Sequence, residues 1–248
     1  LARARGRSQR ASSAGRKTSG CRSGACIARF YTCAVERTAP DGPALDQPAL
    51  AALAQRLKAL ASDAGFQRVG ISGVELGDDE RHLRDWLAQG LHGSMQWMAR
   101  HGDKRSRPSE LLPGTLRVLA VGMDYGREPA EAWANLRDHE RAYVARYALG
   151  RDYHKLMRQR LQRLADEVAK EIGPFGFRVF VDSAPVLERA LARNAGLGWI
   201  GKHTCLIDKD GGSWFFLGEI YLDLPLPVDA PAGNHCGSCS RCIEVCPT

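Results

Sequence analysis

Four cysteines within eleven residues constrain this chain more than any other feature. Near its end they form the spacing C-x2-C-x2-C-x3-C, followed by proline, at Cys236, Cys239, Cys242 and Cys246. This spacing is typical of bacterial [4Fe–4S] proteins, in which three thiolates hold one cluster and the fourth ligates another. The spacing therefore predicts iron–sulfur ligands, with Cys246 on a short helix that points away from the first three.

Two other interpretations of the cysteine run, zinc binding and disulfide formation, have less support. Zinc sites usually take pairs of ligands from separated loops, whereas these four are contiguous. A disulfide framework needs an oxidising compartment, and the sequence has no export signal. The run cannot complete two clusters alone, and Cys205 is expected to be a small buried residue rather than a ligand. We therefore expect a second cysteine run beyond Thr248 and a truncated chain that is inactive as it stands.

The net charge of +7 is concentrated at one end. Residues 1–45 hold nine Lys/Arg against two Asp/Glu, so the rest of the chain is neutral overall. A basic first segment suits a transit peptide or a nucleic-acid-binding arm, but it has no apolar period and no interleaved aromatics. We expect residues 1–46 to be a disordered or non-native extension. No stretch is apolar enough to span a membrane, which excludes an integral membrane protein.

Apolar periodicity predicts a folded body of mixed α and β structure. Leucines at Leu50, Leu53, Leu57 and Leu60 mark one face of a helix. Further helices are expected at 78–89, at 94–101, along an apolar stripe over 157–172, and at 185–195; strands are expected at 66–72, 116–125, 177–182 and 213–222. The class is therefore α/β or α+β. We expect one domain over 47–226 and the start of a second at 227–248.

A glycine run, Gly196-Leu-Gly198-Trp-Ile-Gly201-Lys202, matches the dinucleotide-binding pattern and nearly matches a P-loop. Such loops follow a strand and open a helix. This run follows a predicted helix, and His203 stands where a P-loop needs Ser or Thr. The sequence therefore argues against a nicotinamide or ATP site, and the glycines are expected to allow positive φ or close approach to a large ligand.

Five segments taken together resemble the epoxyqueuosine reductase family. They are GRDYHK at 150–155, DSAPVLER at 182–189, GLGWIGK at 196–202, SWFFLGE at 213–219 and the cysteine run with its flanks at 236–248. The resemblance covers roughly 47–248. It implies a cobalamin-binding α/β domain followed by the start of a ferredoxin-like domain that carries two [4Fe–4S] clusters in the full-length family.

The resemblance also implies an activity, the reduction of epoxyqueuosine to queuosine at the wobble position of tRNA. Such an oxidoreductase takes electrons from an external donor, acts in the cytoplasm without membrane attachment, and is expected to be a monomer. Two alternatives are a reductive dehalogenase-like enzyme and a non-catalytic ferredoxin-type electron carrier. The first is disfavoured because the sequence has no twin-arginine export signal, and the second would hold clusters without cobalamin.

Asp182 is the expected proton donor, because it lies at the C-terminal end of a predicted strand and matches the family's proton donor. Parallel α/β sheets place ligands at such strand ends, and burial beneath a large ligand favours a neutral carboxylic acid. From the residues alone, a helix cap is an equally good use of an Asp before Ser183-Ala-Pro185.

The resemblance assigns the remaining contacts to cobalamin. They are Asp182 itself, Arg105, Ala145, Lys202, His203 and Thr204. From the residues alone, Arg105 is equally a solvated loop charge and Ala145 an ordinary packing residue. The basic run that opens the long helix (Tyr153, His154, Lys155, Arg158, Arg160 and Arg163) suits tRNA phosphates or an exposed helix face. Trp97 and Trp199 are expected in the core, with stacking on a base as the alternative.

Overall fold

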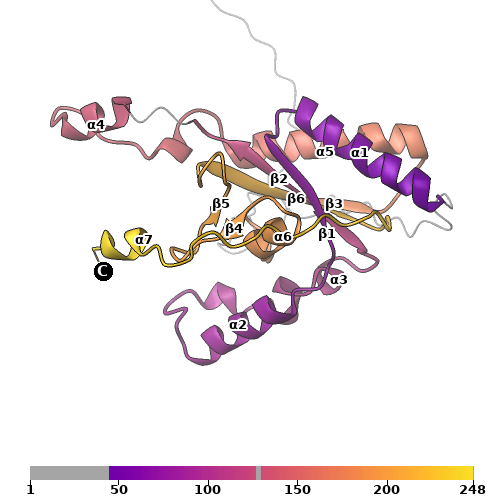
Figure 1. Ribbon diagram of the computed structural model, residues 1–248, viewed down its shortest axis with the longest axis horizontal. Coiled ribbons are helices and arrows are strands. Elements are labelled where there is room, and N and C mark those ends of the chain that lie inside the picture. Colours follow the sequence, from indigo (N-terminus) through magenta and orange to yellow (C-terminus); the bar gives the residue numbers. More distant parts are fainter. Residues whose placement is uncertain (1–44, 127–129, 248) are drawn as a thin grey trace, which may run out of the picture. The chain divides into compact units, whose positions relative to one another are not determined.

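The computed structural model describes residues 45–126 and 130–247. Their centre is a four-stranded sheet in the order β1-β2-β6-β3, shown in Figure 1. The strands are β1 Arg68–Ser72, β2 Arg117–Asp124, β6 Phe215–Leu222 and β3 Phe177–Phe180. Every neighbouring pair is antiparallel. The mixed α and β class is confirmed, but the parallel-sheet argument used to place Asp182 is wrong for this topology.

The expected strand at 177–182 is shorter and less buried than predicted. β3 ends at Phe180 and pairs only with β6, so it is an edge strand of the sheet. Three of its four residues are partly exposed. Its shortness leaves Val181 and Asp182 outside the ladder, free to turn toward α6.

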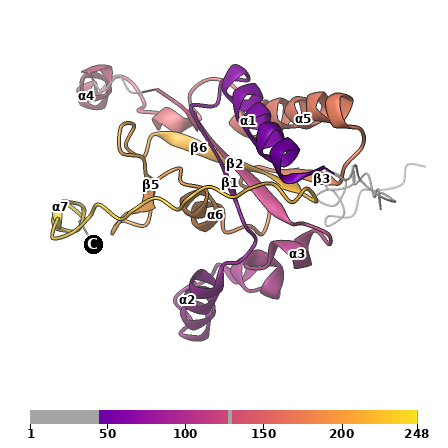
Figure 2. The ribbon, with the colours of Figure 1, turned by 45° about the vertical axis from the view of Figure 1, so that its right-hand side comes forward.

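Two long helices cover one face of the sheet, α1 (Gln47–Asp63) and α5 (Tyr153–Ile172), as Figure 2 shows. Both begin at an aspartate, Asp46 and Asp152, whose side chain accepts a backbone N–H of the first turn. The predicted leucine stripe of α1 packs against α5 and the strands in one apolar cluster. Burial of each such leucine contributes about 1.5–3 kcal/mol.

The short helix α6 (Glu188–Asn194) packs on the opposite face, together with the hairpin of β4 (Trp199–Ile200) and β5 (Leu206–Ile207). The glycine run follows α6 and contains β4, so it does not lead from a strand into a helix as a phosphate loop does. A Cβ at Gly198 would lie 2.2 Å from the carbonyl oxygen of Ile207. The glycine is required there for close backbone approach.

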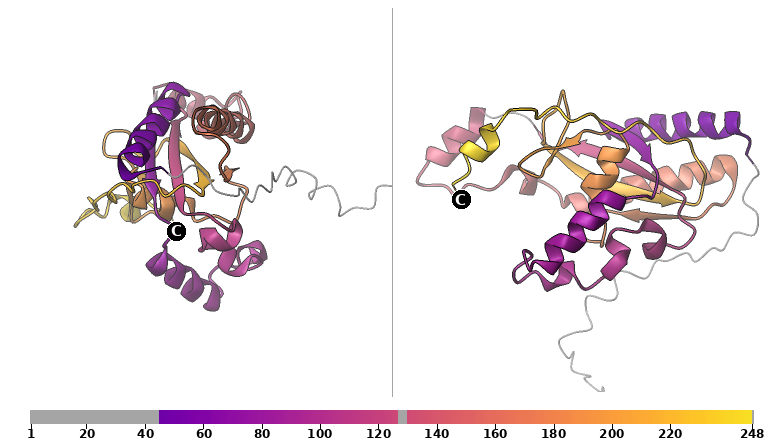
Figure 3. Two further views of the ribbon diagram at one scale, coloured as in Figure 1. Left: turned by 90° about the vertical axis from the view of Figure 1, so that its right-hand side faces the viewer. Right: turned by 60° about the horizontal axis from the view of Figure 1, so that its bottom comes forward.

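The connections between strands carry shorter helices (Figure 3). They are α2 Gly77–Ala88, η2 Gln96–Met98, η3 Gly102–Arg105, α3 Pro108–Leu111, α4 Ala130–Arg137 and η4 Arg146–Ala148. Arg193 of α6 ties α2 to the body through an ion pair with Asp79, at 2.7 Å between Nη2 and Oδ2. Within the described ranges, no helix has the length and apolarity needed to cross a bilayer.

The cysteine segment (236–246) follows a proline-rich stretch (225–233) that runs beside β1. Asp229 fixes this stretch, because it accepts the N–H of Ile71 and pairs with Lys58. The last helix, α7, covers Arg241–Glu244 and therefore holds Cys242. The prediction that Cys246 lies on a short helix is wrong, since the helix ends two residues before it. Residues 1–44, with their three cysteines and most of the predicted extension, lie outside the described residues.

Candidate active site

Asp182 adopts a backbone conformation that few residues other than glycine tolerate. Its φ is 56°, and Thr204 (φ 69°) is the other non-glycine residue with positive φ within the described ranges. Such residues cluster at functional sites, where the surrounding structure holds them in place. Both were candidates from the sequence. The helix-cap alternative for Asp182 is excluded, because α6 begins at Glu188 with Leu187 at its N-cap.

The carboxylate of Asp182 is bonded to a histidine held between two acids. His154 Nε2 lies 2.9 Å from Asp182 Oδ2, and His154 Nδ1 lies 3.0 Å from Asp152 Oδ1. Both ring nitrogens need a proton to donate to these oxygens, so the arrangement favours the imidazolium. Partial burial lowers the pKa of His154, but the two hydrogen bonds outweigh it and the net pKa is raised.

Aromatic stacking fixes the orientation of this histidine. The ring of Tyr153 stacks on His154 at 3.9 Å between centroids and on Phe216 of β6 at 3.8 Å. Burial and the nearby Asp182 raise the pKa of Tyr153, so its hydroxyl stays protonated at neutral pH. The start of α5 thus places a charged donor beside Asp182, whose own side chain is 58% exposed.

The first turn of α6 holds both strained residues. Glu188 Oε1 accepts the backbone N–H of Asp182 at 2.7 Å. The next residue, Arg189, donates from Nη1 to the backbone carbonyl of Thr204. One helix turn therefore fixes the backbone of the expected acid and of an expected cofactor contact.

The loop after β4 connects the site to the cysteine segment. Lys202 Nζ donates to the carbonyl oxygens of Gly237 and Cys239, both at 2.9 Å. Trp199 Nε1 lies 3.4 Å from the sulfur of Cys236, and this donor lowers the pKa of the Cys236 thiol. Trp199 is therefore a half-buried contact of the cysteine run and not a core residue.

The thiol chemistry of the run fits an iron–sulfur donor set. Cys236, Cys239, Cys242 and Cys246 are all partly or fully exposed. Across residues 45–126 and 130–247, no three His, Cys, Asp or Glu side chains are grouped closely enough to hold a metal ion. Cys205 is also exposed, so the expectation of a buried small residue is wrong.

The other two expected cofactor contacts, Arg105 and Ala145, lie in or next to the short helices η3 and η4. Arg105 is 7% exposed, and its guanidinium lies over the ring of Trp97 at 5.7 Å while donating to the Trp97 and Met98 carbonyls. It is not a solvated loop charge, and burial lowers its pKa. Trp97 is 51% exposed, contrary to the expected core position. Ala145 is exposed before η4, where its carbonyl accepts from Ala148, so close packing is absent there.

Lys202, His203 and Thr204, three of the expected cobalamin contacts, are consecutive in the sequence and exposed on the loop between β4 and β5. The loop has backbone hydrogen bonds of its own, from Thr204 N to Gly201 O and from Cys205 N to His203 Nδ1. Its remaining polar groups face solvent. They fit the amide side chains of a corrin, which both donate and accept hydrogen bonds.

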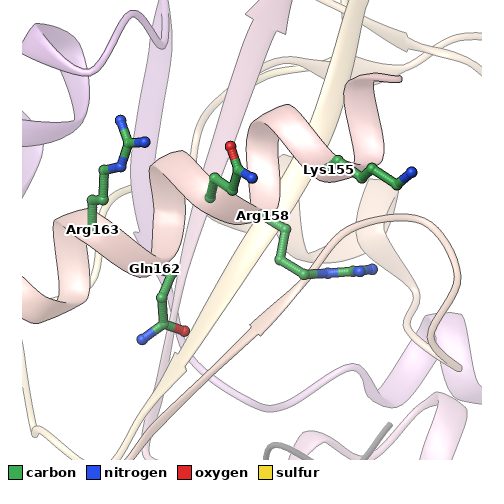
Figure 4. A pocket seen from close by; sticks show the side chains of 5 residues that line it. Lys155, Arg158, Gln162 and Arg163 are labelled. Atoms are coloured by element: carbon green, nitrogen blue, oxygen red, sulfur yellow. The ribbon is translucent and has the colours of Figure 1, made fainter. Parts of the chain in front are cut away.

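Part of the basic run on α5 lines a shallow pocket of about 420 Å³. Figure 4 shows its side chains leaving one helix, and they are Lys155, Arg158, Gln159, Gln162 and Arg163. Arg160 points elsewhere, since it contacts the sulfur of Met123 and lines a second pocket of about 400 Å³ with Tyr153 and Phe216. The run is thus divided between two surfaces.

Sequence reasoning missed the supporting roles of His154, Glu188 and Arg189. The sequence offers His154 only as a candidate for phosphate binding, and Glu188 and Arg189 only as part of the segment DSAPVLER. Their partners lie 28, 6 and 15 residues away in the chain, so no local period marks them. A signal was present nonetheless, because Asp152 and His154 flank the start of a helix beside an aromatic residue.

Comparison with known proteins gives a consistent result. The family model described as "Epoxyqueuosine reductase QueG, DUF1730" matches residues 105–183. An epoxyqueuosine reductase of Xanthomonas campestris pv. campestris is 76% identical over 196 residues, which are 79% of this chain and 55% of that protein. The chain thus spans about half the length of the curated relatives it matches.

Solved structures share the fold. A Bacillus subtilis epoxyqueuosine reductase, with its catalytic aspartate loop swung out of the active site, matches 80% of this chain and 52% of its own at 25% identity and a TM-score of 0.71. An epoxyqueuosine reductase with a tRNA-Tyr epoxyqueuosine-modified tRNA stem loop matches the same shares at 24% identity and a TM-score of 0.69.

Proposed function

We propose that this chain, which belongs to the epoxyqueuosine reductase family, carries the proton-donating part of an enzyme that reduces epoxyqueuosine in tRNA to queuosine. The observation that carries the reaction is the 76% identity to the Xanthomonas enzyme over 196 residues. The net change is the addition of two electrons and two protons to the epoxide, which loses its oxygen as water. When bound, cobalamin and [4Fe–4S] clusters supply the electrons at low potential, from an external donor.

Asp182 would deliver the proton to the departing oxygen. A proton donor must lie within hydrogen-bonding reach of that oxygen, and the exposed carboxyl of Asp182 faces outward for this role. His154 would supply Asp182 with its next proton, since its Nε2 is already 2.9 Å from the carboxylate. The catalytic aspartate loop of the Bacillus subtilis relative supports an acid on a movable loop.

The proposed cofactor contacts are the residues that the family resemblance assigns to cobalamin. Lys202, His203 and Thr204 would bond the corrin amides. Arg105 would first have to leave the ring of Trp97, and Ala145 would offer a surface with no bulky side chain. Cys236, Cys239 and Cys242 would hold one cluster, and Cys246 would ligate the other. The division into a cobalamin-binding domain over 47–226 and a cluster domain from 227 is part of the same proposal.

The substrate would lie across the start of α5. Lys155, Arg158 and Arg163 are exposed around one shallow pocket, where cationic side chains attract the phosphates of a folded RNA. The relative with a modified tRNA stem loop supports this substrate class. Such an enzyme would act as a monomer in the cytoplasm, where tRNA is found.

Complementation of a bacterial strain that accumulates epoxyqueuosine tests the function. The gene that encodes this chain, read to its own stop codon, should restore queuosine in tRNA as measured by mass spectrometry. Asp182→Asn should reduce the rate of the purified, cofactor-loaded enzyme by about 10²–10⁴, the usual contribution of a general acid. Unchanged epoxyqueuosine in the complemented strain would overturn the reaction, and an active Asp182→Asn would overturn the role of this residue alone.

A further inference from the structure

A second acid, Glu219, lies buried behind the active site in an otherwise apolar strand. It occupies the middle of β6, it is 0% exposed, and its neighbours across the sheet are Ala120 on β2 and Phe180 on β3. Neither of its carboxyl oxygens meets a hydrogen-bond donor among the described residues. An ionised carboxylate in such a place is strongly disfavoured, so the site requires either a proton or a donor.

The group beside it is Glu188, the residue that holds the backbone of Asp182. Two ionised carboxylates both accept and cannot bond each other, whereas one proton turns the pair into donor and acceptor. Burial, then the neighbouring charge of Glu188, raises the pKa of Glu219, and burial raises that of Glu188 to about 7. The other titratable groups that face the pair are Asp182, Arg189, Tyr153 and Tyr221.

We propose that Glu219 and Glu188 share a proton, with Glu219 donating to the Glu188 carboxylate, and that this pair holds Asp182 in its left-handed conformation. Glu188 Oε1 accepts the Asp182 N–H at 2.7 Å, which is the link between the pair and the site. The two glutamates are positioning residues, because they act through Asp182. The importance of that position for catalysis rests on the proposed function, whereas the shared proton does not.

The pair also makes the position of Asp182 depend on pH. As pH rises through the titration of the pair, a second buried charge appears and the two carboxylates repel each other. Glu188 is then displaced, the Asp182 N–H loses its acceptor, and the strained φ of 56° is no longer supported. Glu219→Gln replaces the shared proton with a permanent amide donor, so this variant should not show the alkaline change.

Infrared spectroscopy of the full chain tests the shared proton directly. At neutral pH a protonated carboxyl band should be present, and it should shift when only glutamate carries ¹³C in its carboxyl group. The label separates this band from Asp223, another acid whose pKa burial raises. Glu219→Gln should remove the band, and the exposed control Glu75→Gln should keep it. A wild-type chain with no ¹³C-shifted acid band at neutral pH would overturn the proposal.

The link to Asp182 is tested by its backbone amide in the NMR spectrum. The amide proton should be displaced downfield by the Glu188 carboxylate and should titrate with the pair. Glu188→Gln keeps an accepting oxygen, so the signal should stay downfield but stop titrating. Glu188→Ala should move it upfield. An amide shift that is the same in wild type, Glu188→Gln and Glu188→Ala would show that Glu188 does not hold Asp182.

Activity of the cofactor-loaded, full-length enzyme then separates positioning from folding. Glu188→Ala should lower kcat by at least tenfold with KM for the tRNA within twofold, and Glu188→Gln should recover most of kcat. Glu219→Gln should remove the alkaline fall of kcat. An unchanged alkaline limb in Glu219→Gln would overturn the pH role. An inactive wild-type enzyme would contradict the proposed function. It would leave the shared proton intact, because the infrared and NMR measurements do not depend on turnover.

Discussion

The two faces of the β1-β2-β6-β3 sheet differ in what they bury. The face under α1 and α5 buries the main apolar cluster, with Ile220 and Leu222 of β6 among its fully buried residues. The face under α6 carries Glu219 and Tyr221 of the same strand. Because side chains alternate along a strand, one segment serves both faces. This protein therefore separates a stabilising side of the sheet from a side that positions charged groups.

The largest effect should be a loss of stability when a side chain buried on the apolar face is shortened. Leu161 of α5 is completely buried in the main cluster, so Leu161→Ala should lower the free energy of unfolding by about 2–5 kcal/mol. Chemical denaturation measures this change. The control is Leu149→Ala, since Leu149 is 61% exposed and its loss should change stability by no more than about 0.5 kcal/mol. An equal loss of unfolding free energy in the two variants would show that burial on this face contributes no special stability.

A second test concerns the outer surface of α5, which belongs to neither face. Arg158→Ala should weaken binding of a tRNA stem loop about three- to tenfold and reduce the slope of log K against log salt by nearly one. Fluorescence anisotropy at several salt concentrations gives both values. Arg81→Ala on α2 removes the same charge from an exposed site and should leave the slope unchanged. If Arg158→Ala did not change the slope of log K against log salt, the RNA would not bind at this surface of α5.

The pKa of His154 in the active site should also be shifted in a defined direction. Hydrogen bonds to Asp182 and Asp152 raise the pKa of His154, so these bonds stabilise the fold below the ordinary histidine value and are lost as pH rises through the folded-state pKa. Because the ring is partly exposed, the effect on stability should be less than about 1 kcal/mol.

NMR titration of the His154 ring protons checks this direction. The midpoint should lie above the ordinary value of about 6.5 and should fall in Asp182→Asn. His82→Gln, on the exposed side of α2, serves as the control and should leave the midpoint of His154 where it is. A midpoint below 6.5 in the wild type would mean that the imidazolium is not held between the two acids.

The smallest effect is expected from the hydrogen bonds that Lys202, in the loop after β4, makes to the cysteine segment. Lys202 holds the carbonyls of Gly237 and Cys239, so Lys202→Met should speed amide hydrogen exchange across 236–242 about two- to fivefold. Hydrogen-exchange mass spectrometry of the chain without metal reports this directly. Lys209→Met, an exposed lysine on the next loop, is the matched control. Identical exchange in both variants would show that Lys202 does not anchor the segment.

Local patterns predicted the scaffold well. The leucine spacing of α1 and the apolar stripe of α5 both correspond to helices of the structure. The patterns failed where pairing with distant residues decides the outcome. The antiparallel order of the sheet, the short edge strand β3 and the exposure of Cys205 each depend on which segments meet, and no local period records that.

The sequence by itself determined most of the helices and strands and the spacing of the four cysteines, because each depends on neighbouring residue types or a contiguous motif, and the family resemblance pointed to Asp182. Only the tertiary structure decided that His154 meets Asp182, that Glu188 and Arg189 hold the two left-handed residues, and that Glu219 lies buried beside Glu188. These contacts join α5, α6, β6 and the loops after β3 and β4, and no local pattern of the sequence marks which of them meet. Their energies arise from burial and from charges brought close together, and neither exists until the chain has folded.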